Sequence, residues 1–186
     1  MATIASTRAT LDDLYREKGK AELIGGMIVK LMATGRWPHR IAFRIARSLD
    51  DHANATRVGE AYTDNMGFTV PVLSSGRQSF SPDASYFAGP FPPQEMRFIE
   101  GPPTFAVEVR SESDYGDAAN REYEDKRADY FEAGTLVVWD VDPVAETITC
   151  HRRGGQPPDI FRRGNTADAE PAVPGWRMPV DALLAT

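Results

Sequence analysis

Residues 104–141 read TFAVEVRSESDYGDAANREYEDKRADYFEAGTLVVWDV, and this segment indicates the fold class. It opens with an apolar run that only Glu108 and Arg110 interrupt, as expected for a strand inside a sheet that carries polar residues at one end. A helix is predicted from Asp117, the expected N-cap, to Gly134, where it should stop, and a second buried strand, TLVVWDVD, follows. A strand, a helix and a strand in this order can form a right-handed crossover between parallel strands.

Three segments before this unit carry clear local signals. ATLDDLYREKG, residues 9–19, predicts a short helix with Thr10 at its N-cap and Asp13 completing a capping box. AELIGGMIVKLMA, residues 21–33, predicts a β-hairpin that turns at Gly25-Gly26, because glycine adopts the positive φ that both central turn positions need. A helix is predicted over 38–53 because its apolar residues share one face: Ile41, Ala42, Ile45, Ala46 and Leu49.

The other segments favour antiparallel strands. Runs at 60–62, 68–73 and 84–87 predict a meander with a turn at 74–76, and ETITCHRR (146–153) is expected to pair with the strand before it. The fold class is therefore α/β or α+β, a mixed β-sheet flanked by helices with an added N-terminal helix and hairpin. We expect one domain over 1–186, with a core at about 10–153 and a loop-rich extension, 154–186, that packs back on it.

Composition excludes several classes of protein. The chain has 186 residues, of which 41% are hydrophobic and 26% charged, so disorder, collagen and coiled coil are excluded. Its single cysteine, Cys150, favours a cytoplasmic location, and its longest apolar run, Leu136 to Trp139, is too short to span a membrane. The net charge of -6 argues against coating nucleic acid by bulk charge, so a polyanion must be bound by a local patch.

Two carboxylates are candidates for a metal site. Asp83 follows Pro82 at the start of a predicted strand, and Glu108 lies in an apolar strand, where an unpaired carboxylate would cost several kcal/mol. If they converge at strand ends, then with a backbone carbonyl and water they suit Mg²⁺ or Mn²⁺. Arg110 shares a strand face with Glu108, so it can pair with Glu108 or reach a phosphate.

Lys126 offers an amine on the helix that follows this strand. Its predicted neighbours on the helix face are Tyr123, Tyr130 and Ala133. Two interpretations stay open: the ammonium group serves the site, or it only extends to solvent from an apolar stripe.

At these residues the chain resembles a known family. SPDASYF (81–87), FAVEVRSES (105–113), EDKRADYFEAGTLVVWDVDP (124–143) and PGWRMPVDALL (174–184) are similar to successive blocks of the Uma2 family of restriction endonucleases, a branch of the PD-(D/E)XK nuclease superfamily. AELIGGMIV and PHRIAFRI match the same pattern, so the resemblance covers roughly residues 10 to 184. It implies a restriction-endonuclease-like fold, with Asp83 and Glu108 as metal-binding acids and Lys126 as the superfamily's lysine, moved from the strand to the next helix.

Two further positions match the family, and a few depart from it. Glu22 matches an acidic residue before the first hairpin turn and could complete a second metal site or bind a ligand; a surface carboxylate is the alternative. His39 matches a histidine of the second helix, where it could contact phosphate or cap the helix. The departures are Arg110 and Glu112, where an aliphatic residue and a proline are common, and Gly25-Gly26-Met27, where an acidic residue is usual.

The resemblance implies hydrolysis of DNA phosphodiesters with Mg²⁺ or Mn²⁺, by a homodimer because two related sites most simply cut both strands of a duplex. A basic stripe on the second helix supports a DNA partner, although a solvated face paired with acids is the alternative: Arg36, Arg40, Arg44 and Arg47. A non-catalytic binding or interaction module that keeps the fold is the competing function. A small-phosphoester hydrolase is a third, for which no phosphate-binding glycine-rich loop is visible.

Overall fold

The computed structural model describes residues 8–185. A six-stranded mixed sheet organises the chain in the order β11-β10-β9-β8-β6-β3. β8 and β9 are parallel, and every other neighbouring pair in this sheet is antiparallel. The strands are β3 (Glu60–Thr63), β6 (Ala84–Phe87), β8 (Phe105–Val109), β9 (Val137–Asp142), β10 (Thr147–Arg152) and β11 (Asp159–Phe161).

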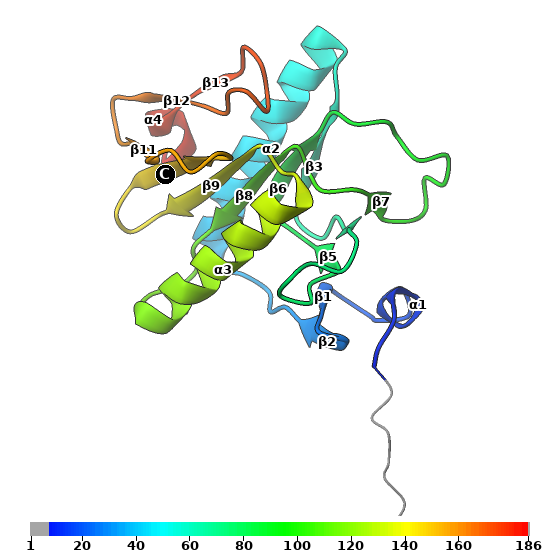
Figure 1. Ribbon diagram of the computed structural model, residues 1–186. Coiled ribbons are helices and arrows are strands. Elements are labelled where there is room, and N and C mark those ends of the chain that lie inside the picture. The colour runs from blue at the N-terminus through cyan, green and yellow to red at the C-terminus, as the bar shows by residue number, and fades with distance from the viewer. Residues whose placement is uncertain (1–7, 186) are drawn as a thin grey trace, which may run out of the picture.

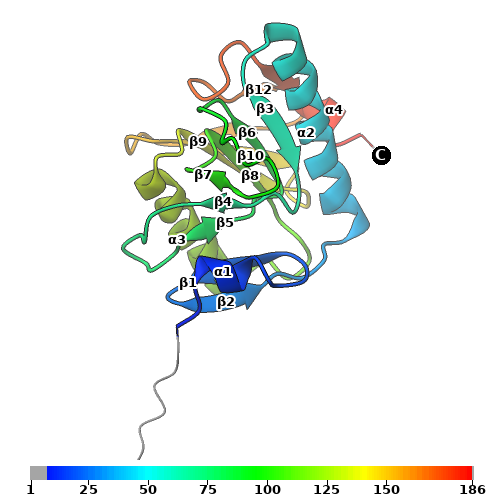
Figure 2. The same cartoon turned by 90° about the vertical axis from the view of Figure 1, so that its right-hand side faces the viewer.

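Two long helices cover opposite faces of this sheet. α3 (Asp117–Ala133) connects β8 to β9 in front of the sheet, and α2 (Arg36–Thr56) lies behind it (Figure 1). The view turned by 90° shows the sheet between the two helices (Figure 2). This layered arrangement confirms the predicted mixed sheet flanked by helices.

Side-chain alternation along the strands divides the interior into two parts. On β8, Phe105, Val107 and Val109 join the apolar side chains of α2 in one cluster, whereas Ala106 joins a second cluster that contains Tyr130 of α3. Successive residues of a strand point to opposite faces, so Glu108 must lie on the α3 face. The sheet thus has an apolar face toward α2 and a face toward α3 on which charged groups are placed.

The N-terminal helix and hairpin are present where the sequence predicted them. α1 (Leu11–Leu14) has the capping box between Thr10 and Asp13, and β1 (Ala21–Ile24) pairs with β2 (Met27–Lys30) across a turn in which both glycines have positive φ. The turn that precedes β5 holds this hairpin in place, because Gly25 N donates to Gly76 O and Gln78 N donates to Leu23 O, each at 2.8 Å. In both views α1 and the hairpin lie together at one end of the main sheet (Figures 1 and 2).

The predicted meander is wrong. β3 pairs directly with β6, and the run at 68–73 instead leaves the main sheet to form β4 (Phe68–Thr69) between β5 (Ser79–Phe80) and β7 (Ile99–Glu100). The reason is burial: Phe68 and Phe80 are fully buried in the cluster that contains Tyr130, so this small sheet covers apolar surface on the α3 side.

The N-cap of α3 also differs from the prediction. Gly116, with φ 96°, is the N-cap, and Asp117 is the first helical residue. A backbone with φ near +96° suits glycine, while a carboxylate in the first turn is stabilised by the positive end of the helix dipole. The helix ends at Gly134 in a left-handed conformation, as predicted.

The C-terminal segment contains strands that the sequence analysis did not assign. β12 (Thr166–Asp168) pairs with β13 (Arg177–Pro179), and α4 (Val180–Leu183) follows. The ring of Trp176 lies 5.1 Å from that of Trp139 and donates a hydrogen bond to Ser48 Oγ of α2. Within residues 8–185 none of the helices combines the length and the apolar character that crossing a membrane requires.

Candidate active site

Asp83 and Glu108 both line one cavity at the end of two neighbouring strands. β6 and β8 are antiparallel with Ala84 opposite Val107, and Asp83 directly precedes β6. The Asp83 N–H donates to Val107 O at 3.1 Å, one residue out of this register, so the regular pairing ends at Ala84. On the other side, Glu108 is the register partner of Asp140 on β9. Three carboxylates from neighbouring strands therefore line this cavity, an arrangement that is destabilising unless cations compensate it.

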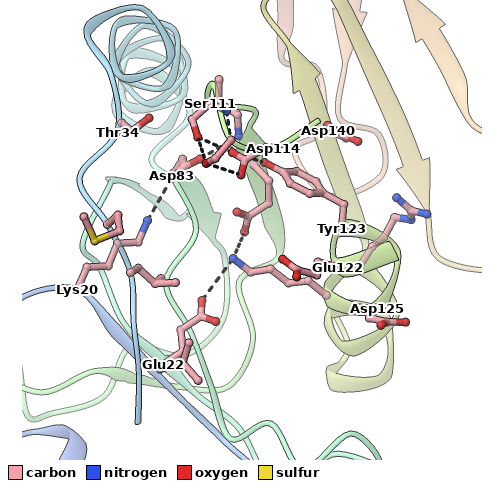
Figure 3. Close-up of a pocket in the computed structure, with 18 of the residues that line it drawn as sticks. Lys20, Glu22, Thr34, Asp83, Ser111, Asp114, Glu122, Tyr123, Asp125 and Asp140 are labelled. Carbon is pink, nitrogen blue, oxygen red and sulfur yellow. Dashed lines mark hydrogen bonds and ion pairs between the residues drawn. The ribbon is translucent and has the colours of Figure 1, made fainter. Parts of the chain in front are cut away.

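Each of these three carboxylates has a cation from a different part of the chain. Lys126 Nζ of α3 is 2.8 Å from Glu108 Oε1, and Lys20 Nζ, just before β1, is 3.1 Å from Asp83 Oδ1. Arg110 donates two hydrogen bonds to Asp140, at 2.9 and 2.7 Å. Figure 3 shows Lys20 paired with Asp83 and, across the same cavity, Glu22, whose partner is Lys126.

The ammonium of Lys126 therefore lies between Glu108 and Glu22 and does not extend freely to solvent. Burial disfavours its charged form, but the charges of Glu108 and Glu22 outweigh burial and raise the pKa of the amine. Burial also raises the pKa of Glu108, and the nearby Asp83 adds to this, while Lys126 opposes it. Lys126 is consequently a fixed ammonium group, and the site still favours additional positive charge near Glu108.

Glu22 is buried, so the alternative of a surface carboxylate is wrong. It is 2% exposed, pairs with Arg77, accepts from Ser81 N at 2.9 Å and lies 3.4 Å from Lys126 Nζ. Arg77 Nε donates in turn to Asp129 Oδ2 at 2.8 Å. The hairpin thus supplies a carboxylate to the lysine of α3, and Arg77 and Asp129 fix that carboxylate.

Five residues of this charged cluster were missed by the sequence analysis: Lys20, Asp64, Arg77, Asp129 and Asp140. Lys20 is two residues before Glu22, and Asp129 is one turn after Lys126, so the hairpin and helix periodicities could have identified these two. Asp64 lies in the turn after β3, and Arg77 forms an isolated bridge with Ile24 before β5, so no periodicity marks either of them. Tyr130, which the sequence placed beside Lys126, donates its hydroxyl to Glu108 Oε1 at 2.7 Å.

Arg110 does not pair with Glu108. Beyond its two bonds to Asp140, it donates to Asn120 and to Asp114 O, and its guanidinium lies 4.6 Å from the centre of the Tyr123 ring. Arg110 follows the end of β8, and its planar fork matches the Asp140 carboxylate on β9, while Lys126 already contacts Glu108. The idea that Arg110 neutralises Glu108 is therefore wrong.

The basic stripe of α2 is divided in its role. Arg44 is half-buried and donates to the carbonyls of Leu183 and Ala185, so it fastens the C-terminal turn. The other three arginines are exposed, and none forms an ion pair with another of residues 8–185: Arg36, Arg40 and Arg47. His39 is exposed as well, and it is not the helix cap, because Gly35 holds that position.

A cavity of about 650 Å³ contains the site, and its lining includes Lys20, Glu22, Asp83, Glu108 and Lys126. Among residues 8–185 no three Asp, Glu, His or Cys side chains converge closely enough to form a ready metal cage. The candidate donors of the sequence analysis, the two carboxylates Asp83 and Glu108, line this cavity, and such a pair fits Mg²⁺ or Mn²⁺ because these ions use one or two carboxylates and keep several waters.

The charge of the site fits a divalent ion as well. Five carboxylates and three cations form the connected ion pairs around Asp83 and Glu108, leaving two negative charges: Asp64, Asp83, Glu108, Glu22 and Asp129 against Lys20, Lys126 and Arg77. One Mg²⁺ or Mn²⁺ would neutralise this excess.

Comparison with known proteins agrees with the fold and with the resemblance. The model of the Uma2 family, described as "Putative restriction endonuclease", matches residues 8–181. A crystal structure from Anabaena variabilis ATCC 29413, described as a "putative nuclease belonging to DUF820", superposes with a TM-score of 0.75 over 94% of this chain and 97% of that chain, at 18% sequence identity. No curated protein matches the sequence. The structural likeness shows the fold, and the family match extends over nearly the whole chain, so this protein belongs to the Uma2 family of restriction-endonuclease-like proteins.

Proposed function

We propose that this protein is a metal-dependent endonuclease that hydrolyses DNA phosphodiester bonds. The observation that carries the proposal is that Asp83 and Glu108 line one cavity, in which the ammonium of Lys126 is 2.8 Å from Glu108. A divalent cation held by the two carboxylates, together with the fixed ammonium, would suit the negative charge of a phosphate in the course of hydrolysis. Membership in the Uma2 family supports a nuclease-like fold around these residues.

Asp83 Oδ1 and the carboxylate of Glu108 would hold Mg²⁺ or Mn²⁺. The ion would supply positive charge to the phosphate oxygens and lower the pKa of a bound water. Asp83 is oriented for this role because its second oxygen, Oδ2, accepts a hydrogen bond from Val109 N at 2.9 Å. The main chain of β8 therefore aims Oδ1 into the cavity.

The protein's own residues orient the reacting groups. Lys126 holds a permanent positive charge beside the phosphate, and Glu22 keeps its ammonium group in place from the other side, at 3.4 Å. Tyr130 donates to Glu108 and limits the positions that this carboxylate can take. Removing any of these groups would weaken stabilisation of the transition state more than binding of the substrate.

DNA is the proposed substrate because a basic helix begins beside the cavity. Thr34 lines the cavity and α2 starts two residues later (Figure 3), so the three exposed arginines of α2 lead away from its rim. Guanidinium groups in such a row can contact successive phosphates of a duplex, which gives a local attraction in a protein of net charge -6. A homodimer with one such site for each strand remains part of the proposal.

Plasmid cleavage in Mg²⁺ or Mn²⁺ tests the proposal. We expect nicking that falls at least about a hundredfold in Asp83→Asn, Glu108→Gln and Lys126→Met, since each removes a charge aimed at the reacting phosphate. Glu112→Gln is the matched control, because Glu112 is exposed and outside the cavity lining. Cleavage that is equal in all four variants would contradict the proposal.

A non-catalytic nucleic-acid-binding or protein-interaction module is the second candidate. It is favoured by one observation, namely that Lys20 and Lys126 compensate Asp83 and Glu108 without any metal. DNA binding that needs the α2 arginines but is accompanied by no cleavage in either metal would favour this second function.

A further inference from the structure

Two lysines at the site share an arrangement: each lies between two carboxylates. Lys126 contacts Glu108 at 2.8 Å and Glu22 at 3.4 Å, and Lys20 contacts Asp83 at 3.1 Å and Asp64 at 2.5 Å. Asp83 and Glu108, which line the same cavity, are here called the inner carboxylates. Glu22 and Asp64 are the outer carboxylates.

The two outer carboxylates differ in how firmly they are held. Glu22 is buried and fixed by Arg77 and by the Ser81 N–H, so Lys126 has little freedom. Asp64 lies in the turn after β3 with 31% of its side chain exposed, and its hydrogen bond within the described chain is with the neighbouring Asn65 N–H. Asp64 therefore lies at the solvent-exposed edge of the site and Glu22 in its interior, while the side chains of the two lysines are buried to a similar extent.

Lys20 faces the one oxygen of Asp83 that is not engaged by the main chain. Oδ2 accepts from Val109 N, whereas Oδ1 is 3.1 Å from Lys20 Nζ. Oδ1 is the Asp83 oxygen that the main chain leaves free, so we expect a cation shared by the inner carboxylates to bind there. A divalent ion and an ammonium at the same oxygen repel each other strongly, because both lie within about 4 Å in a partly desolvated cavity.

We propose that Lys20 is an exchangeable counter-ion that sets the affinity of this site for divalent cations. Lys20 holds Asp83 Oδ1 when no ion is bound, and it moves entirely to Asp64 when a cation takes its place. The proposal rests on the function proposed above only in that it assumes a cation site at Asp83 and Glu108. It assigns to Lys20 and Asp64 a role in metal affinity, with no direct contact to the reacting phosphate.

The exchange predicts that substitutions of Lys20 and of Asp64, which contact each other, change the affinity for the cation in opposite directions. Without Lys20 the cation has no competitor for Asp83, so it binds more tightly. Without the Asp64 carboxylate, Lys20 has no second partner and stays on Asp83, so the cation binds more weakly. If Asp64 acts only through Lys20, its effect must vanish when Lys20 is absent, and this defines a double-mutant cycle.

Calorimetric titration of the intact protein with Mn²⁺ measures these effects without any nuclease assay. We expect Lys20→Met to tighten the Kd by at least about tenfold. Asp64→Asn should weaken the Kd several-fold, and the double variant should match Lys20→Met. Lys18→Met is the control for the charge change, because Lys18 is exposed, two residues away and outside the cavity lining. Lys20→Gln repeats the test if Lys20→Met unfolds below the titration temperature.

Two outcomes would overturn the exchange while leaving the metal site intact. One is a Kd in Lys20→Met that is unchanged or weaker; the other is an Asp64→Asn effect that persists without Lys20. The variant Asp83→Asn distinguishes failure of the exchange from failure of the proposed function. If the parent protein and Asp83→Asn bind Mn²⁺ equally, or if neither the parent nor Lys20→Met binds it, there is no cation site at Asp83 and both proposals are wrong.

Discussion

The two faces of β8 and β9 are built from alternate residues of the same strands, yet they are opposite in character. Toward α2, Phe105 and Trp139 pack edge to face at 5.1 Å in an apolar cluster. Toward α3, Glu108 and Asp140 face each other from the same two strands, and each needs a cation. The period of two that makes the sheet also confines these charged groups to one face, where they lie beside the smaller apolar cluster around Tyr130.

This difference shows how a small domain can bury a charged site. Ion pairs taken out of water gain little net stability, because the cost of desolvation offsets their attraction. The α2 face, together with the C-terminal segment around Trp176, buries apolar surface that provides stability. The α3 face can then hold charges that add little to the stability of the fold.

Truncation on the apolar face should have the largest effect on stability. Phe105 is fully buried between the rings of Trp139 and Trp176, so Phe105→Ala should lower the free energy of unfolding by about 3–5 kcal/mol. Urea denaturation measures the change, and Mn²⁺ titration of the folded variant should still detect the site. A loss below about 1 kcal/mol would mean that stability does not reside mainly on this face.

Arg77→Met tests how much the buried ion pairs on the α3 face contribute to stability. The change leaves Glu22 and Asp129 without their shared partner, and we expect a loss of about 3 kcal/mol in the free energy of unfolding. The triple variant Arg77→Met, Glu22→Gln and Asp129→Asn should recover much of this loss, because it removes the uncompensated charges as well. Denaturant unfolding measures the free energy of unfolding of both variants. If the triple variant is as unstable as the single variant, Arg77 stabilises the protein through packing and not through its charge.

The smallest effect is expected from His151, which lies on β10. Burial and the charge of Arg127 lower its pKa from 6.5 to about 4, so the unfolded chain takes up a proton at a higher pH than the folded protein. Above about pH 6.5, His151 is neutral in both states and does not reduce the free energy of unfolding. As the pH falls from 6.5 toward 4, the unfolded chain is protonated first, and the free energy of unfolding decreases.

His151→Gln should reduce the slope of stability against pH in this window. The change should amount to about 1 kcal/mol or less, because His151 is only half-buried and water screens the charge. Thermal unfolding from pH 7 to pH 4 provides the measurement. Identical slopes in the parent protein and the variant would place the pH sensitivity in other groups.

Periodicity and turn chemistry were enough to predict most of the elements. The apolar face of α2, the capping box of Thr10 and the double-glycine turn depend on neighbours within a few residues, and the structure contains all three. The meander failed because the choice of β6 as the partner of β3 depends on burial of Phe68 and Phe80 elsewhere. Local signals cannot report such a choice between distant partners.

For the candidate site, Asp83, Glu108 and Lys126 were named from the sequence, but most of the groups that pair with them were not identified. An acid in an apolar strand and a lysine in a helical stripe show in the sequence that charges must be compensated, because isolated buried charges are too costly. The pairing of cations with acids depends on the strand pairing of β6 with β8 and on the position of the hairpin. Arg77 and Glu22, and likewise Lys20 and Asp83, are 55 or more positions apart in the sequence. Local sequence therefore established the elements and their charged residues. The packing of distant segments chose the partners, because a Coulomb interaction depends on separation in space and not along the chain.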